Sequence, residues 1–486
     1  MNGELEKLNP ERLYHFFAQI CKVPRPSKKE AGMVAYLLDF ARQRSLYAAR
    51  DEVGNVLIRK PACKGYENLE TVVLQSHMDM VCEKNSAIQH DFDHDPIIPY
   101  VEGEWIKAKG TTLGADDGIG IAAQLAILDA HDVSHGPIEC LFTTDEETGL
   151  TGAFGLKAGF LEGKILLNLD SEDEGQIFIG CAGGKDTVAH LSYRREDTPD
   201  GAAAVKLSVG GLKGGHSGDD INKGLGNAVK ILNRLLWQVA RRFSGQLSDI
   251  HAGNLRNAIA REGWAVITVP EQNTAALLEF VDAFQSIMKD ELHVTDSGVV
   301  VTAERVEVPT GVVANSDFIK LLNVLYACPH GMTAMSQDIA NFVETSTNLA
   351  SVKMMPDYFE ITTSQRSSVE SAKQNIVDMV ESVFLLAGAS VTHSNGYPGW
   401  APNPASPILN IAVKSYRELF DSDPEVLAIH AGLECGLIGE TYPGMDMISF
   451  GPTIKGAHSP DERLHIPSVN KFWNLTLELL KRIPSK

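Results

Sequence analysis

The sequence predicts an α/β protein: a mostly parallel sheet forms one domain, and an α+β domain built on antiparallel sheet is inserted into it. In residues 1–183 and 399–486, short apolar runs alternate with helical patterns, which is typical of parallel sheets covered by helices. In residues 184–398, strand-like runs alternate apolar with polar side chains, as in antiparallel sheets with one solvated face. A chain of 486 residues also exceeds what one hydrophobic core usually holds.

The first segment begins with helical patterns over residues 11–46, which two prolines interrupt. Ser27 and Glu30 have the spacing of a capping box and predict a helix over 28–44. A helical pattern follows over 119–129. Apolar runs predict buried strands, and these cover residues 55–59, 71–76, 138–144 and 164–169.

The inserted segment is about 215 residues long, too long for a loop. Its helix–strand order predicts two similar subunits in tandem. Its strands are expected at 203–210, 264–269, 299–308 and 358–364, and its helices at 226–243, 273–289 and 369–386. A Pro- and Gly-rich linker, 397–404, then leads to a helix at 408–420, strands at 425–430 and 445–450, and a final helix at 468–482.

Composition restricts the possible partners and the compartment. A formal net charge of −20 argues against nucleic acid and anionic membranes as partners. The sequence has no run of 18 apolar residues and no apolar segment near its start, so we expect neither a transmembrane helix nor a signal peptide. The seven cysteines are odd in number and never in C-x-x-C spacing, which indicates reduced thiols in the cytoplasm.

Acidic and histidine side chains follow several of the predicted strands, or begin the helix after them. The carboxyl ends of parallel strands meet at one edge of a sheet, so these side chains can gather there. Imidazole and carboxylate together favour zinc over calcium or magnesium. Two divalent ions (+4) would balance three carboxylates (−3) and a bridging hydroxide (−1). The candidate metal ligands are His77, Asp116, Glu147, Asp170 and His458.

Two further residues beside these ligands have candidate roles. Glu146 adjoins Glu147 but is not itself a candidate ligand, so it can act as general base for a metal-activated water. Asp79, two residues after His77, can fix the tautomer of that imidazole. Taken singly, each of these positions has a structural alternative, such as a helix cap or a solvated turn. We interpret the His- and Asp-rich stretch 90–95 as a solvated acidic loop rather than a metal site.

Five motifs together, in order and spacing, resemble the M20 metallopeptidases, and within them most of all the aminoacyl-histidine dipeptidases (bacterial carnosinases). The motifs are residues 77–79, 114–118, 145–149, 168–170 and 456–462. The resemblance implies one zinc ion on His77, Asp116 and Asp170, and a second on Asp116, Glu147 and His458, with Co²⁺ or Mn²⁺ as substitutes. It also implies Glu146 as base, Asp79 as the residue that orients His77, and a cis peptide bond between residues 116 and 117.

The resemblance extends to the inserted domain, which would serve as a lid. His216, in a Gly-rich turn, matches a histidine that reaches the scissile carbonyl and could stabilise the oxyanion. Asn257 and Arg366 match residues that hold the oxyanion and the substrate carboxylate, and Gly432 matches a glycine whose backbone approaches the substrate. In shorter-lid relatives the histidine comes from the partner subunit, so its origin here stays open. A homodimer is expected.

The predicted function is that of a cytoplasmic dinuclear zinc dipeptidase. It would hydrolyse unblocked dipeptides, Xaa-His and β-alanyl-histidine among them, by attack of a metal-bound hydroxide with Glu146 as general base. One alternative is another M20 activity, either a tripeptidase or an N-acyl-amino-acid deacylase. The other is a binding protein that retains the metals without catalysis.

Overall fold

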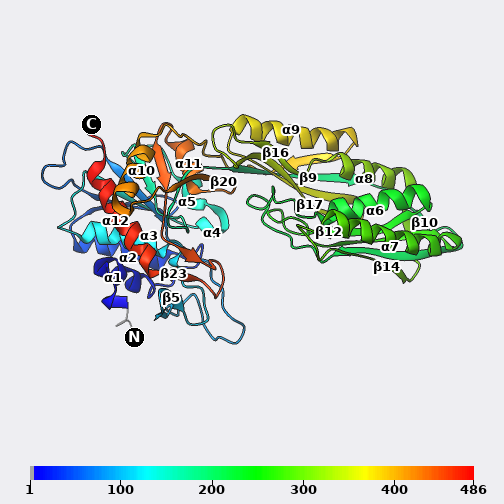
Figure 1. The fold of residues 1–486 in the computed structure, drawn as a ribbon, viewed down its shortest axis with the longest axis horizontal. Coiled ribbons are helices and arrows are strands. Elements are labelled where there is room, and N and C mark those ends of the chain that lie inside the picture. The colour runs from blue at the N-terminus through cyan, green and yellow to red at the C-terminus, as the bar shows by residue number, and fades with distance from the viewer. Residues whose placement is uncertain (1–4) are drawn as a thin grey trace. The chain divides into compact units, whose positions relative to one another are not determined.

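The computed structural model describes residues 5–486, and the chain divides into two compact units (Figure 1). Unit 1 holds the described residues up to Cys181, together with Trp400–Ala428 and Leu433–Lys486. Unit 2 holds Ala182–Gly399 and Ile429–Gly432. The chain therefore leaves unit 1, builds unit 2 and returns.

Unit 1 is built on an eight-stranded sheet with the strand order β1-β2-β6-β3-β7-β21-β8-β20. The central neighbours β6, β3, β7 and β21 run parallel to one another, whereas β1 and β2 pair antiparallel with their neighbours and β8 pairs antiparallel with β21. The strands span Tyr47–Arg50 (β1), Val56–Lys60 (β2), Val72–His77 (β3), Ile138–Thr143 (β6), Ile165–Asn168 (β7), Gln176–Cys181 (β8), Glu425–Ile429 (β20) and Asp446–Ser449 (β21). The predicted α/β class is confirmed, with the parallel part at the centre and antiparallel strands flanking it.

The helices of unit 1 include α1 (Glu11–Ile20), α2 (Ala31–Gln43), α3 (Ala115–Asp129), α10 (Pro407–Phe420), α11 (Glu434–Thr441) and α12 (Ile466–Arg482). Short turns of helix are η1 (Leu5–Lys7), α4 (Glu146–Gly149) and α5 (Thr151–Gly155). Helix α3 packs against α1 and β3 and is buried along almost its whole length. Such complete burial explains why its sequence is apolar nearly all round.

A small four-stranded antiparallel sheet, which the sequence analysis did not predict, completes unit 1. Its order is β22-β23-β5-β4, and its strands span Pro99–Glu102 (β4), Trp105–Ala108 (β5), Ile454–Lys455 (β22) and Arg463–His465 (β23). Strands β22 and β23 form a hairpin whose connecting loop contains residues 456–462. These strands are too short to show a clear alternation in sequence.

The predicted capping box is wrong. Helix α2 begins at Ala31, and no side chain caps it. Instead, the Ser27 hydroxyl donates to Asp79 Oδ2 at 2.7 Å, and Glu30 Oε1 accepts from the backbone N–H of Asp145 at 2.9 Å. Ser27 thus binds a distant residue, and Glu30 Oε1 binds one in addition to the nearby backbone N–H of Lys28 at 2.9 Å.

Unit 2 is built on a nine-stranded antiparallel sheet with the order β14-β11-β13-β12-β17-β18-β9-β19, and β16 also pairs with β17. The strands span Gly183–Ser192 (β9), Ala202–Gly210 (β11), Gln246–Gly253 (β12), Gly263–Pro270 (β13), Val300–Val306 (β14), Gly331–Met335 (β16), Val343–Met354 (β17), Tyr358–Ser367 (β18) and Ser390–His393 (β19). Two short strands, β10 (Arg195–Asp197) and β15 (Gly311–Val313), pair separately. The helices are α6 (Ala228–Arg242), α7 (Thr274–Glu291), α8 (Asn315–Ala327), α9 (Glu370–Leu386) and the short η2 (Glu271–Asn273).

The two similar halves expected in this unit are present, but one is nested inside the other. The inner half runs β11-α6-β12-β13-α7-β14, and the outer half runs β9, then α8-β17-β18-α9-β19. Within the sheet, the strand order of the outer half is the mirror image of the strand order of the inner half. The two halves join where β12 pairs with β17. A nested repeat separates the first strand of the outer half from its own helix, so the sequence pattern suggested a tandem instead.

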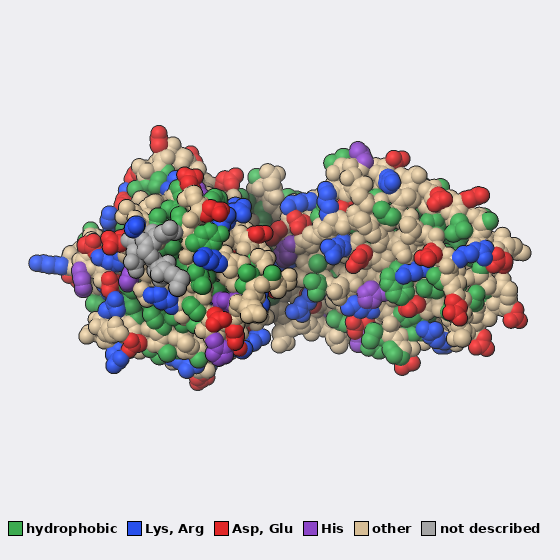
Figure 2. Space-filling model, turned by 90° about the horizontal axis from the view of Figure 1, so that it is seen from below, with side chains coloured by type: hydrophobic (Ala, Val, Ile, Leu, Met, Phe, Trp, Pro, Cys, Tyr) green, Lys and Arg blue, Asp and Glu red, His purple; other side chains and the backbone are tan. Residues whose placement is uncertain are grey.

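Other global features follow from the described residues. No helix among residues 5–486 is long and apolar enough to cross a membrane. All seven cysteines are free thiols. On the face shown in Figure 2, acidic and basic side chains are interspersed, so the negative net charge is not collected in one patch of that face.

Candidate metal centre

Three neighbouring parallel strands end at one edge of the sheet in unit 1. Their register places His77, the last residue of β3, opposite Thr143, the last residue of β6, and places Gln75 opposite Asn168 at the end of β7. The residues that follow these strand ends therefore emerge side by side. Glu147 comes after β6, and Asp170 comes after β7.

Two further candidate ligands reach the same edge from other elements. Asp116 lies at the start of α3, where its backbone and that of Asp117 depart from helical geometry, and the peptide bond between them is cis. The resemblance predicted this cis bond, and it is present. His458 lies in the loop of the β22–β23 hairpin and has a positive φ of 62°.

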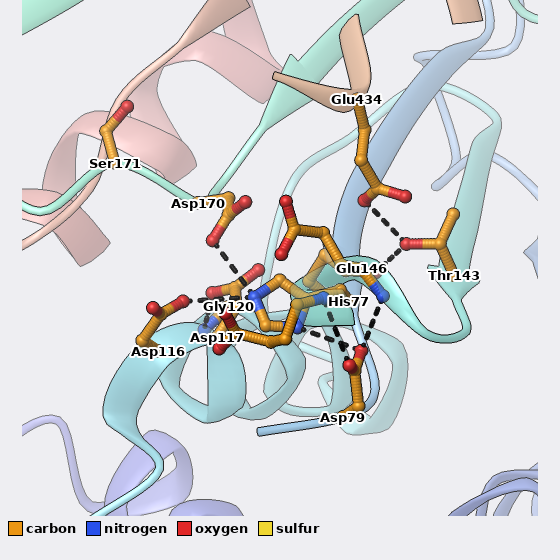
Figure 3. Close-up of polar contacts among 12 residues, drawn as sticks. His77, Asp79, Asp116, Asp117, Gly120, Thr143, Glu146, Asp170, Ser171 and Glu434 are labelled. Atoms are coloured by element: carbon orange, nitrogen blue, oxygen red, sulfur yellow. Dashed lines mark hydrogen bonds and ion pairs between the residues drawn. The ribbon is translucent and has the colours of Figure 1, made fainter. Parts of the chain in front are cut away.

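The five predicted ligands meet in two overlapping groups that share Asp116. In the first group, His77 Nε2 lies 3.0 Å from Asp116 Oδ1 and 3.4 Å from Asp170 Oδ1. In the second, His458 Nε2 lies 3.2 Å from Asp116 Oδ2 and 3.1 Å from Glu147 Oε2. Figure 3 shows His77 with Asp116 and Asp170 on one side of its ring and Asp79 on the other.

The clustered carboxylates of these two groups favour positive charge beside them. Burial would lower the pKa of His77, but the nearby Asp170 and Asp116 carboxylates raise it well above its usual value. Hydrogen bonds to Asp116 and Glu147 raise the pKa of His458 to about 11. Burial raises the pKa of Asp170 to about 7. Protons thus supply the positive charge that the clustered carboxylates need, and a divalent cation can replace them.

The residues fit a pair of divalent ions. Oε1 of Glu147 is buried and has no hydrogen-bond partner among the residues that the structure describes. A buried polar atom without a partner is costly, so an ion that it binds would remove that cost. The ligand atoms of each group lie within 4.8 Å of one another. Two imidazoles and three carboxylates are a donor set that suits zinc or a similar divalent ion.

Asp79 lies directly behind His77. Its Oδ1 is 3.4 Å from His77 Nδ1 and accepts the backbone N–H of Glu146 at 3.0 Å, while Oδ2 accepts the N–H of Glu147 at 3.2 Å. Burial would raise the pKa of Asp79, but its contacts with His77, the Glu146 amide and Ser27 lower it to about 2. One carboxylate therefore holds both the imidazole and the turn that carries residues 146 and 147.

Glu146 belongs to neither of these two groups, but a carboxylate oxygen of it lies within 4.8 Å of ligand atoms of His77 and Glu147. Burial, together with the neighbouring carboxylates Asp170 and Glu434, raises the pKa of Glu146 well above its usual value. A carboxyl group with raised proton affinity is suited to take up a proton and release it again.

The remaining predicted residues lie in unit 2. His216 Nδ1 is 3.2 Å from Asp219 Oδ2 and accepts weakly from the backbone N–H groups of Gly218 and Asp219, both at 3.3 Å. The backbone N–H of Ser217 donates to the carbonyl of Asn257 at 2.9 Å, so the His216 turn and Asn257 are neighbours within this unit. Asn257 itself is exposed.

Arg366 and Gly432 both contact Tyr397. Arg366 is 7% exposed and donates from Nη1 to Tyr397 Oη at 2.8 Å and from Nε to Ser217 Oγ at 3.4 Å. Both acceptors are neutral hydroxyls. A Cβ at Gly432 would lie 2.8 Å from Cε2 of Tyr397, so this glycine leaves room for the aromatic ring.

Three buried charged residues near the metal centre were not predicted from the sequence. Arg25 and Glu462 contact backbone groups of residues 113–116, the segment that carries Asp116. Glu434 accepts from Gln75 Nε2 at 2.6 Å and from Thr143 Oγ1 at 2.7 Å, which ties the N-terminus of α11 to the ends of β3 and β6 (Figure 3). Glu462 lies inside a recognised motif, but nothing in its spacing indicated a partner.

Comparison with known proteins agrees with this geometry. A model of peptidase family M20/M25/M40 matches residues 73–482. The chain is 46% identical over 487 residues to the cytosol non-specific dipeptidase of Escherichia coli K12, and the matched region covers 100% of both proteins. The solved structure of aminoacylhistidine dipeptidase from Vibrio alginolyticus is similar with a TM-score of 0.92 and 44% identity, covering 99% of this chain and 98% of that one.

A more distant structure extends the likeness of fold alone. A tripeptidase from Staphylococcus aureus superimposes with a TM-score of 0.57 at 18% identity, covering 98% of this chain and 99% of that one. The Escherichia coli and Vibrio alginolyticus relatives are both named dipeptidases, and their names differ in the range of substrates that they indicate.

Proposed function

The chain belongs to peptidase family M20, and from that premise we propose that it is a dipeptidase with two zinc ions per chain, acting on unblocked dipeptides that include Xaa-His and β-alanyl-histidine. The observation that carries the proposal is the pair of overlapping ligand groups that share Asp116, with Glu146 beside them. The two highly similar relatives support hydrolysis of dipeptides. Preference for a C-terminal histidine has support only from the name of the Vibrio alginolyticus enzyme.

The ligand assignment follows the two groups. His77, Asp116 and Asp170 would hold one ion, and Asp116, Glu147 and His458 the other. When bound, such ions polarise a carbonyl oxygen and lower the pKa of water to near neutrality. Co²⁺ and Mn²⁺ are the expected substitutes for zinc.

The chain's own residues would supply the proton transfers. Glu146, with its raised pKa, takes the proton from the attacking water and passes it to the amine that leaves. Asp79 keeps the His77 imidazole oriented through Nδ1, so that Nε2 points to the metal centre.

Unit 2 would supply the groups that recognise the substrate. Arg366 is suited to bind the C-terminal carboxylate, because a guanidinium binds a carboxylate through two parallel hydrogen bonds, and its hydrogen-bond acceptors are neutral hydroxyls. His216 and Asn257, which adjoin each other, would stabilise the oxyanion. We propose that Gly432 lies beside the substrate. Its missing side chain leaves room for the Tyr397 ring.

We also propose that the enzyme is cytoplasmic and forms a homodimer. The Escherichia coli relative is named a cytosol enzyme, which supports the location. The dimer rests on the family resemblance. Light scattering of the purified protein tests it, and a mass equal to one chain would contradict it.

The test of function is a substrate panel on the zinc-loaded full chain. We expect hydrolysis of β-alanyl-histidine, other Xaa-His dipeptides and dipeptides without histidine, and little activity on a tripeptide or an N-acetyl amino acid. Dominant turnover of the tripeptide or the acylated substrate would establish the alternative M20 activity instead.

A second measurement separates catalysis from metal binding. Glu146→Gln keeps the size of the side chain and removes its basicity. We expect two bound zinc ions per chain, as in the wild type, with kcat reduced about 10²–10⁴-fold. Unchanged kcat would remove Glu146 from the mechanism, whereas loss of zinc would make Glu146 a ligand.

A further inference from the structure

Two buried ions of opposite charge hold the backbone of the segment that carries Asp116, and the proposed mechanism uses neither. Arg25 is 3% exposed and lies between α1 and α2. Glu462 is 2% exposed and lies in the β22–β23 loop, four residues after His458. Burying an ion costs several kcal/mol unless its hydrogen bonds are satisfied, so the partners of each ion indicate what it is there to hold.

Arg25 connects the end of strand β3 to the Asp116 segment. Its Nη1 donates to the carbonyls of the two residues that follow His77, that of Met78 at 3.0 Å and that of Asp79. Its Nη2 donates to the carbonyl of Gly114. A single planar guanidinium thus fixes the residues after His77 relative to the residues before Asp116.

Two glycines leave the space that Arg25 occupies. A Cβ at Gly114 would lie 2.6 Å from Arg25 Nη2, and one at Gly118 would lie 2.8 Å from the same atom. Gly114 also has a φ of +67°, a conformation that side-chain-bearing residues rarely adopt. The glycines that flank Asp116 in the sequence motif are therefore explained by the guanidinium.

Glu462 connects the His458 loop to the same segment through its amide groups. Its Oε2 accepts from the backbone N–H of Leu113 at 2.7 Å and of Gly114 at 2.9 Å. Its Oε1 accepts from the N–H of Ala115 at 2.7 Å and of Asp116 at 3.3 Å. Four N–H donors on one carboxylate fix the hairpin loop against the start of α3.

His458 depends on such an anchor. Its side chain is 55% exposed, and its backbone has a positive φ in a short loop. Its two contacts are with the carboxylates of Asp116 and Glu147. The contacts of Glu462 with backbone N–H groups of residues 113–116 also hold the His458 loop to the Asp116 segment.

We propose that Arg25 and Glu462 are positioning residues of the metal centre: Arg25 sets the Asp116 segment relative to His77, and Glu462 sets His458 relative to the Asp116 segment. Asp116 belongs to both ligand groups, and metal–ligand distances tolerate errors of about 0.2 Å, so each group needs its own anchor. The inference rests on the proposed two-ion centre. It predicts that each anchor affects one ion more than the other.

The test is a titration of the metal-free full chain with Zn²⁺ against a chelating indicator, with ¹⁵N-labelled histidines observed by NMR. Glu462→Gln is expected to weaken binding of one zinc ion about 10–100-fold, and the first equivalent of zinc should shift His77 and not His458. Arg25→Met is expected to show the reverse, with His458 shifted first. Arg25→Lys keeps the charge and replaces Arg25→Met in this titration if Arg25→Met does not fold.

Matched controls separate positioning from general stability. Glu139 is also a buried carboxylate that accepts two backbone N–H groups, from Glu162 and Gly163, but at the other end of β6. Lys60 donates to the carbonyls of Ile127 and Ala130 at the far end of α3. Glu139→Gln and Lys60→Met should lower the Tm and leave both zinc affinities within about twofold.

The outcomes are distinguishable. If the wild type binds fewer than two zinc ions, the proposed function fails before the variants are considered. If the wild type binds two, but Glu462→Gln and Arg25→Met lose only Tm, as the controls do, the two residues are structural and the inference is overturned. Equal weakening of both ions in each variant would also overturn it.

Discussion

Asp79→Asn is the substitution whose effect the structure defines most closely. The change keeps the shape of the side chain and removes its charge and one acceptor oxygen. In the wild type, Oδ1 faces His77 Nδ1 and the Glu146 amide, and Oδ2 accepts from the Glu147 amide and the Ser27 hydroxyl. An Asn side chain can keep only one of these oxygens.

The magnitude follows from counting the donors. With the amide nitrogen at the Oδ2 position, the Ser27 hydroxyl can turn to accept, but the N–H of Glu147 then faces another donor. One lost hydrogen bond to a charged group, with a buried N–H left unpaired, costs about 1.5–3 kcal/mol. Because the turn carrying Glu146 and Glu147 then loosens, we expect zinc affinity to fall about 10–100-fold and kcat to fall with it.

The assay compares Asp79→Asn with Asp446→Asn. Asp446 likewise accepts from a serine hydroxyl, that of Ser406, and from a backbone amide, that of Ile408, but at the start of β21. Urea unfolding of the metal-free proteins should show a similar loss of stability in both variants. Only Asp79→Asn should lose zinc affinity and kcat. Equal zinc affinity in the two variants would refute the reasoning.

Three further predictions concern other parts of the chain. Tyr397→Phe removes the acceptor of Arg366 Nη1, so KM for an unblocked dipeptide should rise about 5–10-fold with kcat little changed; a fall in kcat alone would contradict this. Gly120→Ala puts a Cβ 2.3 Å from Asp117 Oδ1, which should cost about 1–3 kcal/mol in urea unfolding and weaken zinc binding; wild-type stability would show that the carboxylate can move. Burial lowers the pKa of His330 to about 4, below its unfolded value near 6.5. The contribution of the neutral imidazole to the free energy of unfolding is therefore fully present above pH 6.5. It is lost as the pH falls toward 4, by at most about 3 kcal/mol. His330→Asn, which can still accept from the Leu349 N–H, should lose this pH dependence; the same profile in both proteins would remove His330 as its source.

The family and the fold class could be predicted from the sequence because their signals are local. Buried strands such as β3 and β6 are apolar runs, and the side chains that follow them are polar, so strand ends and their chemistry are visible without a structure. The set of motifs around His77, Asp116, Glu147, Asp170 and His458 was enough to recognise the M20 family.

Only the tertiary structure decided which polar groups satisfy one another. Ser27 and Glu30 have a local capping pattern, yet both bind residues more than fifty positions away. Arg25 and Glu462 have no local pattern at all, because their partners are backbone groups from distant segments. Backbone amides and carbonyls are the same at every position, so a sequence can show which side chain is charged but not which backbone it will hold. That choice is made when buried charges must find partners in the packed fold.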